Sequence, residues 1–565
     1  MITYFISAPD RHRQFLHLSA EFPVNHQDVF HLQLPAWRPG RYELGNFAKN
    51  IRAFDVVDAS GKPLSFVKET KDLWRVDTRG VSTVVVSYQF YADSLNAGST
   101  WVDDEQVYIN PINCFFYNPA DPDAQFRLEF DLPKDYTIAC GMPVVENHVL
   151  SAVGVQHLMD CPIMASASLT HWTYTSNNCL FHIWIQGEHQ SIKERFIKDH
   201  QLFTDSQITA FGDIPCEEYH FMYHFPAFAV RHGVEHQNST VIAMGPASRL
   251  TEEDWYRELI GISCHELYHT WNIKSIRPSE MMPYDFSREN YSRLGYVAEG
   301  VTTYFGDQFL HRCGVFDDEE YFSRLATTIE RHLNNPGRFN MSVADSSFDT
   351  WIDGYQPGIP WRKVSIYNEG LLFAFICDVA ILKATNGKKS LDDAMLLMYK
   401  RFGKSGKGYN ENDYQTILEE VSGVNFTQLF GRYIRGTEDY MPAIGEALVD
   451  VGLQLEELLN ESPLSAHLGF LVDTKGKITL VMPNSPADKA GLWFDDQIIQ
   501  VNGRAFGEYD RSLVMASSLV SLEINRHNKV KNLTIQATDE PWLNRIRLSR
   551  NDDVNSSMFN DWWRG

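Results

Sequence analysis

The sequence predicts a multidomain α+β protein in which three regions of different texture follow one another. At 565 residues the chain is too long for one hydrophobic core, because single cores stop growing near ~250–300 residues. Short alternating apolar runs fill the first region, helical spacing dominates the second, and strand-like segments return near residue 451. We therefore expect domains at residues 1–175, 176–450 and 451–540, with a C-terminal tail at 541–565.

The first region, residues 1–175, has the pattern of an antiparallel β domain. Its apolar residues alternate with polar ones, its strands are rich in β-branched and aromatic residues, and turn residues interrupt it often. Clear examples are Phe15–Phe22, Val29–Leu34, Val84–Phe90 and Phe126–Leu132. This pattern predicts a sandwich or barrel.

The middle region is mainly helical, with its strands at the front. Two strand-like segments, Tyr219–Phe225 and Ser239–Met244, precede a run of segments with helical spacing. The predicted helices are 194–205, 251–272, 295–313, 319–333, 367–384, 391–402, 411–421 and 426–434. This order predicts one mixed domain of about 275 residues, near the upper size of a single core.

Composition excludes several classes of partner. Lys plus Arg is 50 against 73 Asp plus Glu, a net charge of −23, which opposes binding to nucleic acid or to an anionic membrane. The longest apolar stretch, Gly370–Leu382, contains Asp378 and is too short to cross a bilayer. No basic start followed by an apolar run marks a signal peptide, so we expect a cytoplasmic protein.

The eight cysteines are scattered and form no CxxC pair. This spacing excludes a cysteine zinc knuckle and a thioredoxin motif, and it differs from the dense cysteine framework of small secreted domains. We expect reduced, mostly buried thiols.

The segment Ser263–Asn272 contains the decisive motif. His265 and His269 are four residues apart, so on a helix they share one face and can bind the same ion. Glu266 lies next to the first histidine, where it can take a proton from the attacking water without ligating the metal. Because such a motif also arises by chance, on a helix whose histidines only fill a core, a third ligand is needed to support it.

Glu299 provides that third ligand in a plausible place. It lies in or near the first turn of another predicted helix, and residues 270–298, which are 29 residues, leave room for the chain to reverse. Two histidines and one glutamate suit Zn²⁺ and leave a fourth coordination position open, which is the catalytic rather than the structural arrangement.

Together these motifs resemble the gluzincin clan of zinc peptidases and, within it, the glycyl aminopeptidase family (metallopeptidase family sixty-one). The matching segments are Pro35–Tyr42, Gly233–Ser239, His265–Pro278, Pro283–Asp285 and Glu299–Tyr304, together with a C-terminal region similar to PDZ domains. The resemblance spans nearly the whole chain except its final tail.

The resemblance implies a β-rich N-terminal domain, a thermolysin-like catalytic domain and a C-terminal PDZ domain. It implies a zinc-dependent aminopeptidase that removes small first residues, chiefly glycine and alanine, from peptides with a free N-terminus. His265, His269 and Glu299 correspond to the ligands of one catalytic Zn²⁺ ion, and Glu266 to the general base.

Three further positions acquire roles through the same resemblance. Glu235 takes the place of a glutamate that binds the substrate's free amine, and His236 either positions that glutamate or polarises the scissile carbonyl. Tyr367 matches a tyrosine that donates its hydroxyl to the oxyanion, although Ile366 and Glu369 depart from the family pattern there. Tyr304 is the alternative donor, but its place on the ligand helix favours orienting Glu299. Core packing and surface exposure are the ordinary alternatives for Tyr367 and Glu235.

In the C-terminal region, Leu468, Gly469 and Phe470 correspond to the loop with which PDZ domains bind a carboxylate. Their backbone amides would hold a peptide C-terminus while the peptide adds a strand to the sheet. A brace or lid within the chain is an equally good interpretation.

Two other functions compete with the aminopeptidase. A catalytically silent PDZ adaptor would retain the peptidase fold without metal, but then the chain has no chemical reason to keep His265, Glu266, His269 and Glu299. An endopeptidase of the thermolysin type would use the same four residues and would not need Glu235 to bind an amine.

Overall fold

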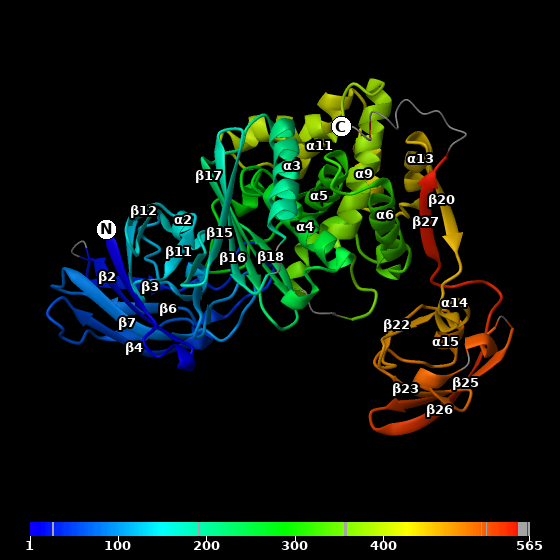
Figure 1. Cartoon of the computed structure of the whole chain (residues 1–565), viewed down its shortest axis with the longest axis horizontal. Coiled ribbons are helices and arrows are strands. Elements are labelled where there is room, and N and C mark those ends of the chain that lie inside the picture. Colours follow the sequence, from blue (N-terminus) through cyan, green and yellow to red (C-terminus); the bar gives the residue numbers. More distant parts are fainter. Residues whose placement is uncertain are drawn as a thin grey trace. The chain divides into compact units, whose positions relative to one another are not determined.

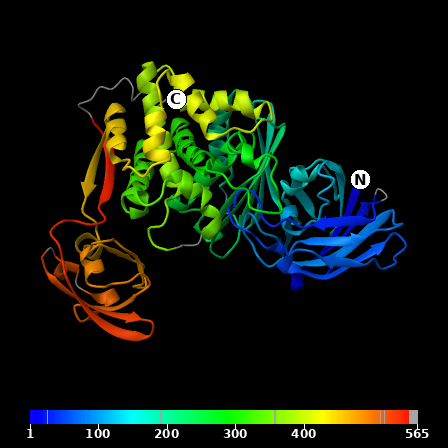
Figure 2. The same ribbon diagram turned by 180° about the vertical axis from the view of Figure 1, so that it is seen from behind.

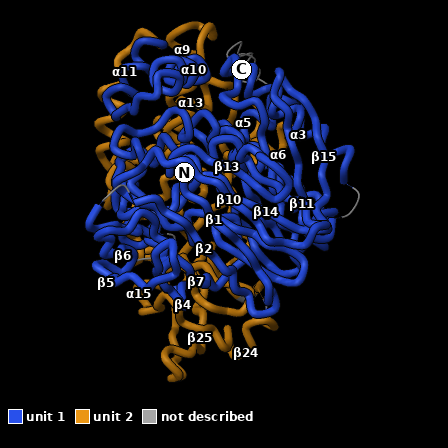
Figure 3. Tube along the Cα trace, turned by 90° about the vertical axis from the view of Figure 1, so that its left-hand side faces the viewer, with its two compact units in different colours: residues 1–316, 347–358, 391–421 blue, residues 317–346, 359–390, 422–565 orange. Residues whose placement is uncertain are grey.

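The computed structural model describes residues 1–24, 27–189, 192–354, 359–509, 511–515, 517–551 and 562. It divides into two compact units that do not follow the chain in simple order (Figure 3). The first unit comprises residues 1–316, 347–358 and 391–421, and the second comprises residues 317–346, 359–390 and 422–565. Each unit is described separately below.

The first unit begins with three sheets, as the alternating pattern predicts. A seven-stranded sheet has the order β12-β13-β10-β1-β2-β7-β4, and it is antiparallel except for the parallel pair of β1 and β10. The other two sheets have the orders β3-β6-β5 and β11-β14-β9-β8 (Figure 1). The bounds are β1 Ile2–Ser7, β2 Phe15–Pro23, β3 Val29–Gln33, β4 Ile51–Asp58, β5 Phe66–Lys68, β6 Leu73–Asp77, β7 Thr83–Tyr91, β8 Trp101–Val102, β9 Gln106–Ile109, β10 Gln125–Asp131, β11 Thr137–Cys140, β12 Val144–Glu146, β13 Val149–Val153 and β14 Ile163–Ser166. Two short helices, α1 Pro111–Cys114 and α2 Val155–Met159, connect them.

A five-stranded sheet follows, with the order β15-β16-β17-β19-β18. Strands β16, β17 and β19 are parallel, while β15 and β18 are antiparallel edge strands. The bounds are β15 Thr170–Ser176, β16 Cys179–Gly187, β17 Glu218–Phe225, β18 Val230–Glu235 and β19 Ser239–Gly245. The sheet thus starts at Thr170, inside the segment we expected to belong to the N-terminal domain.

Helices of the first unit cover one face of this sheet (Figures 1 and 2). α3 packs on β15, and α4 packs on β18 and β19, which places the edge strand β18 beside the motif helix. The predicted helices are confirmed as α3 Lys193–Phe211, α4 Glu253–Tyr268, η5 Tyr296–Val301 with α5 Thr302–Arg312, α10 Leu391–Met398 with η7 Tyr399–Gly403, and α11 Glu411–Ser422; α8 Thr350–Asp353 was not predicted.

The second unit has a helical part built on α6 and α9, which pack together. Its elements are α6 Asp318–Leu333, α9 Ile366–Thr385, α12 Thr427–Leu429 with η8 Phe430–Ile434, and α13 Met441–Asp450, while α7 Val343–Phe348 lies at the unit boundary. α9 is buried on nearly all sides within the unit, and this burial accounts for its long apolar run. A two-stranded ribbon of β20 Leu453–Leu458 and β27 Arg545–Arg550 packs on α6 through β27.

The ribbon corrects the tail that we expected at residues 541–565. Residues 545–550 form β27, in which Ile546 and Leu548 are buried and alternate with exposed arginines. Trp562 is 1% exposed and its ring lies 5.7 Å from the rings of Tyr321 on α6 and Phe375 on α9. Residues 545–550 and Trp562 therefore belong to the helical part of the unit, and residues 552–561 and 563–565 of the expected tail lie outside the described residues.

The segment of the chain between β20 and β27 forms a separate small β domain with its own hydrophobic core. Its elements are α14 Pro463–Leu468, β21 Phe470–Val472, β22 Ile478–Val481, α15 Pro486–Lys489, β23 Gln497–Val501, β24 Arg504–Ala505, β25 Leu519–Arg526 and β26 Lys529–Gln536. Gly491, just after α15, and Gly503, in the turn between β23 and β24, both adopt left-handed backbone, and the Ser485 side chain caps α15.

The cysteines agree with the expectation of reduced, mostly buried thiols. All eight cysteines are free thiols, most of them buried. Within the described residues, no helix combines the length and the apolar composition that crossing a membrane requires.

Candidate active site

α4 brings the two motif histidines together at its C-terminal end. His265 lies in the last turn and His269 is the C-cap, so their Nε2 atoms are 3.0 Å apart and their rings are nearly perpendicular, at 86°. His269 is 2% exposed and the His265 side chain 19% exposed. The spacing in the sequence thus produces the shared face that we predicted.

Glu299 reaches the same point from η5, a single π-helical turn that continues as α5. Its Oε2 lies 3.8 Å from Nε2 of His265 and 3.6 Å from Nε2 of His269. Ligands of a tetrahedral Zn²⁺ ion with bonds of 2.0–2.1 Å are about 3.4 Å from one another. The three donor atoms therefore fit such an ion, and π-helical turns are often found at functional sites.

A hydrogen-bond clamp holds the two ligand-bearing segments in register. The Asn272 carbonyl oxygen accepts a hydrogen bond from Nδ1 of His269 at 2.7 Å, which leaves the Nε2 lone pair directed at the shared point. The Asn272 side-chain amide donates to the Val297 carbonyl at 2.9 Å and to Thr302 Oγ1 at 3.1 Å. Asn272 therefore joins the end of α4 to the turn that carries Glu299.

Glu266 is buried beside the histidines, and its Oε2 has no hydrogen-bond partner among the described residues. Burial, reinforced by the nearby Glu235 and Glu299 carboxylates, raises the pKa of Glu266 to about 8 against the lowering effect of His269. Its Oε1 lies against Gly233 of β18, where a Cβ atom would come within 2.2 Å. An uncompensated buried carboxylate in contact with a strand backbone suits a proton acceptor that awaits water and substrate.

Glu235 ends β18 in the same cluster. One oxygen each of Glu235 and Glu266 and one nitrogen of His269 all lie within 4.8 Å of one another. Glu235 is 6% exposed, and Gly40 approaches it so closely that a Cβ there would lie 2.5 Å from Oε2. Three buried carboxylates thus gather around two imidazoles, a charge balance that favours a divalent cation and a substrate ammonium.

The N-terminal β domain contributes side chains to this cluster that the sequence did not reveal. The Tyr42 hydroxyl donates to Glu299 Oε1 at 3.2 Å, and Arg38 is buried close enough to Glu266 to lower its pKa. Gly40 has a left-handed φ of 76°, so glycine is favoured there by conformation as well as by space. All three lie in the segment Pro35–Tyr42. The resemblance of this segment to the family was the sequence feature that could have indicated their place at the site.

His236, Lys274 and Arg277 lie around the site. His236 is 6% exposed, and its Nδ1 is 3.3 Å from Asp160 Oδ1. Lys274 forms an ion pair, also with Asp160, at 2.6 Å. The Arg277 guanidinium stacks on the Tyr284 ring, 4.1 Å from its centroid, and donates to the Lys274 carbonyl.

The remaining predicted residues belong to the second unit. Tyr367 lies in the first turn of α9, two residues before Glu369, which accepts a hydrogen bond from Nδ1 of the buried His332 at 2.8 Å. In the small β domain, the Gly469 N–H donates to the Ser465 carbonyl at 3.2 Å as the helix cap of α14. One of the three amides predicted to bind a carboxylate, at Leu468, Gly469 and Phe470, is therefore already engaged within the domain.

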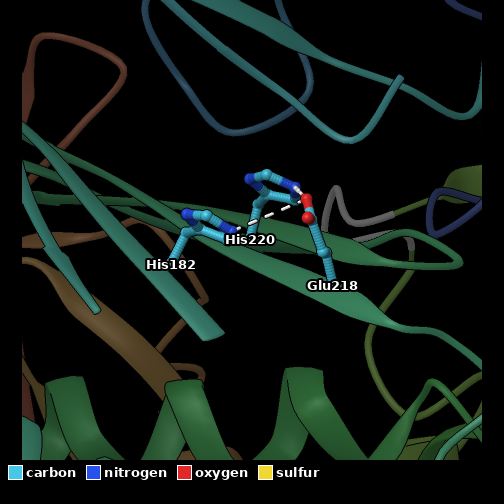
Figure 4. A group of neighbouring side chains, drawn as sticks. All are labelled: His182, Glu218 and His220. Carbon is cyan, nitrogen blue, oxygen red and sulfur yellow. Dashed lines mark ion pairs between the residues drawn. The ribbon is translucent and has the colours of Figure 1, made fainter. Parts of the chain in front are cut away.

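A second group of possible metal ligands, His182, Glu218 and His220, fits a metal less well (Figure 4). Nε2 of the two histidines lies 3.6 and 3.9 Å from Glu218, but the rings are stacked, 4.5 Å apart and 6° from parallel, so their lone pairs do not converge. Burial lowers the pKa of His220 to about 3, and Trp184, which can only donate, bonds to its Nδ1 at 3.2 Å. The neutral ring therefore carries its proton on Nε2, the atom that a metal would need.

Family models match three parts of the chain. The model of the Peptidase M61 N-terminal domain matches residues 3–167, that of the M61 glycyl aminopeptidase matches residues 258–373, and that of the PDZ domain matches residues 450–517. The first match ends just before β15, which agrees with the start of the five-stranded sheet at Thr170. Among curated proteins, none matches the chain.

The chain is similar to solved structures. A crystal structure of an aminopeptidase N family protein from Idiomarina loihiensis is 24% identical and matches over 100% of both chains, with a TM-score of 0.92. An M1 zinc metallopeptidase from Deinococcus radiodurans is 12% identical and matches over 77% of this chain and 93% of its own, with a TM-score of 0.49. The first of these likenesses confirms the multidomain α+β architecture.

Proposed function

Because the chain belongs to the M61 glycyl aminopeptidase family, we propose that it is a zinc-dependent aminopeptidase acting on peptides with a free N-terminus. One observation carries this proposal: the Glu235 carboxylate lies in the same buried cluster as Glu266 and His269. A carboxylate beside the metal ligands can bind an α-ammonium group, and only the first peptide bond then reaches the reactive centre.

His265, His269 and Glu299 would hold the ion through two imidazole nitrogens and one carboxylate oxygen. The chemistry supplied by Zn²⁺ bound there is Lewis-acid polarisation of the scissile carbonyl and a lowered pKa for water. Two hydrogen bonds support this assignment because each orients a ligand: the Asn272 carbonyl holds the His269 ring, and the Tyr42 hydroxyl holds Glu299. The perpendicular histidine rings are consistent with it.

Glu266 would act as the general base and then as the general acid. Its carboxylate takes the proton of the attacking water and delivers it to the leaving amine as the peptide bond breaks. Its unpartnered Oε2 and its place against the backbone of β18 support this role, because an edge strand can also pair with the backbone of an extended substrate.

Glu235 would bind the substrate amine, with His236 holding the hairpin turn that follows it. The match to the model of the M61 glycyl aminopeptidase supports a preference for small first residues, glycine and alanine. Tyr367 would donate its hydroxyl to the oxyanion. The loop formed by Leu468, Gly469 and Phe470 would receive a peptide C-terminus, and the Gly469 N–H would then exchange its hydrogen bond to the Ser465 carbonyl for one to the carboxylate.

Zinc content and hydrolysis of glycine and alanine anilides test the function together. We expect about one bound Zn²⁺, and Glu266→Gln should retain it while kcat falls by about 10³-fold, within the range for loss of a general acid–base. A rate for Glu266→Gln close to that of the unsubstituted protein would overturn the mechanism. A zinc-free, inactive protein that binds peptide C-termini would instead establish the adaptor.

Acetylation of the substrate amine separates an aminopeptidase from an endopeptidase. If Glu235 binds the amine, acetylation abolishes cleavage and Glu235→Ala raises KM for free-amine substrates. Undiminished cleavage of acetylated peptides would establish the endopeptidase, which shares the metal ligands but not the amine site.

A further inference from the structure

Asp160 is a nearly buried residue at which three segments of the first unit meet: the end of α2, the turn between β18 and β19, and the turn after α4. It is the C-cap of α2, in the part of the chain that precedes the five-stranded sheet, and its side chain is 16% exposed. Its oxygens meet the hairpin turn between β18 and β19 and the turn after α4. These two turns directly follow Glu235 and His269.

The hairpin turn is held from the N-terminal side. The Gln237 N–H donates to Asp160 Oδ2 at 2.8 Å, and Nδ1 of His236 lies 3.3 Å from Oδ1. The Asn238 side-chain amide donates to the Gly141 carbonyl at 2.9 Å. Because residue 236 directly follows Glu235, these bonds fix the end of β18 and hence the position of the Glu235 carboxylate.

The turn after α4 is held by the same carboxylate. Nζ of Lys274 lies 2.6 Å from Asp160 Oδ1, and this side chain is only 2% exposed. The Lys274 N–H donates to the His269 carbonyl at 2.9 Å, and the Asn272 carbonyl accepts from the His269 ring. A displacement of Lys274 would therefore be transmitted to the metal-binding histidine through one turn of backbone.

We propose that Asp160 is a positioning residue that sets the separation between the amine-binding carboxylate, Glu235, and the metal-binding turn at His269. This inference rests on the proposed function, because it assigns the amine to Glu235. The separation of these two groups decides which peptide bond lies at the reactive centre. The competing account is purely structural, with Asp160 serving only to neutralise the buried charge of Lys274.

Removing both charges distinguishes the two accounts. Asp160→Ala combined with Lys274→Met leaves no unpaired buried charge, and Asp160→Asn combined with Lys274→Met also keeps an acceptor of the same shape for the Gln237 N–H. The readout is the ratio of the inhibition constants of propionamide and alaninamide, which differ only in the α-amine. This ratio reports recognition of the amine and is independent of the folded fraction of the protein.

For the alanine–methionine variant we expect the ratio to fall by about tenfold, the size expected for loss of one charge-assisted hydrogen bond. We expect the asparagine–methionine variant to keep the ratio of the unsubstituted protein, and both variants to keep their zinc. A matched control removes the buried pair Asp496–Arg526 of the small β domain, 2.6 Å apart, by Asp496→Ala with Arg526→Met. This control should lower the melting temperature without changing the ratio.

An unchanged ratio in the alanine–methionine variant would overturn the inference and leave Asp160 a structural ion-pair partner. Equal loss in the alanine and asparagine variants would also overturn it, because the acceptor would then not matter. Glu235→Ala, measured alongside, tests the premise separately: if the ratio survives that substitution, the proposed amine site is wrong.

Discussion

Gly233 offers a test of the site, because the Glu266 carboxylate lies in the space that a side chain at position 233 would occupy. Replacing it by alanine would place a Cβ 2.2 Å from Glu266 Oε1 and 2.9 Å from Ile262 Cγ2. Ordinary contacts of this kind begin at 3.4 Å, so the carboxylate must move by about 1 Å. The Gly233 backbone is not in the left-handed region, so alanine itself is not strained there.

The cost should fall on catalysis rather than on stability. Glu266 Oε1 is the end of a flexible side chain and can move at little conformational cost, while alanine in a strand gains about 0.5–1 kcal/mol over glycine. A misplacement of about 1 Å at a reacting group can cost about 10²-fold in rate, or about 2.7 kcal/mol of activation free energy. We therefore expect kcat to fall about 100-fold with the melting temperature nearly unchanged.

The assay combines kcat on an alanine anilide, zinc content and thermal unfolding. Gly445→Ala, in α13, is the matched control, because a Cβ there meets nothing within 4 Å; it should leave kcat unchanged and stabilise the helix slightly. A kcat for Gly233→Ala within threefold of the unsubstituted protein would refute the placement of Glu266 against β18. Loss of zinc would refute it as well, since the metal ligands would then have moved instead.

Two further predictions concern the metal and acid stability. Tyr42→Phe removes the hydrogen bond to Glu299 but keeps the ring, so zinc affinity measured against a chromophoric chelator should fall about 10–100-fold; unchanged affinity would contradict the role of Tyr42. Burial lowers the pKa of His200, His220 and His224 to about 3 each. The unfolded chain takes up these protons below about pH 6.5 and the native state does not, so stability should fall as the pH drops from there toward 3. The slope reaches about 4 kcal/mol per pH unit for the three groups together, and denaturant unfolding that is flat from pH 7 to 5 would contradict it.

Local features of the molecule were predictable from the sequence because their cause is local. Most long helices follow from apolar periodicity, and the meeting of His265 with His269 follows from the pitch of one helix. The family motifs indicated Glu235 and Glu299, although only the fold brings those carboxylates within reach of α4.

Pairings between distant segments were not predictable in the same way. β15 and β16 have the alternation of the N-terminal sheets but join the five-stranded sheet, because parallel pairing with β17 decides their place. β27 resembles a polar tail until it pairs with β20, about ninety residues earlier. A strand pattern specifies which face is buried but not which partner buries it.

The sequence by itself supplied the residues of the proposed chemistry: two histidines and two glutamates with spacing suited to metal binding and proton transfer, carried on helices of predictable length. The tertiary structure decided what surrounds that chemistry. Tyr42 lies 257 residues before Glu299 in the chain and Asp160 lies 114 residues before Lys274, yet each forms a hydrogen bond with its partner. Such contacts depend on the closure of long loops and the docking of one sheet against another, and no local periodicity records them.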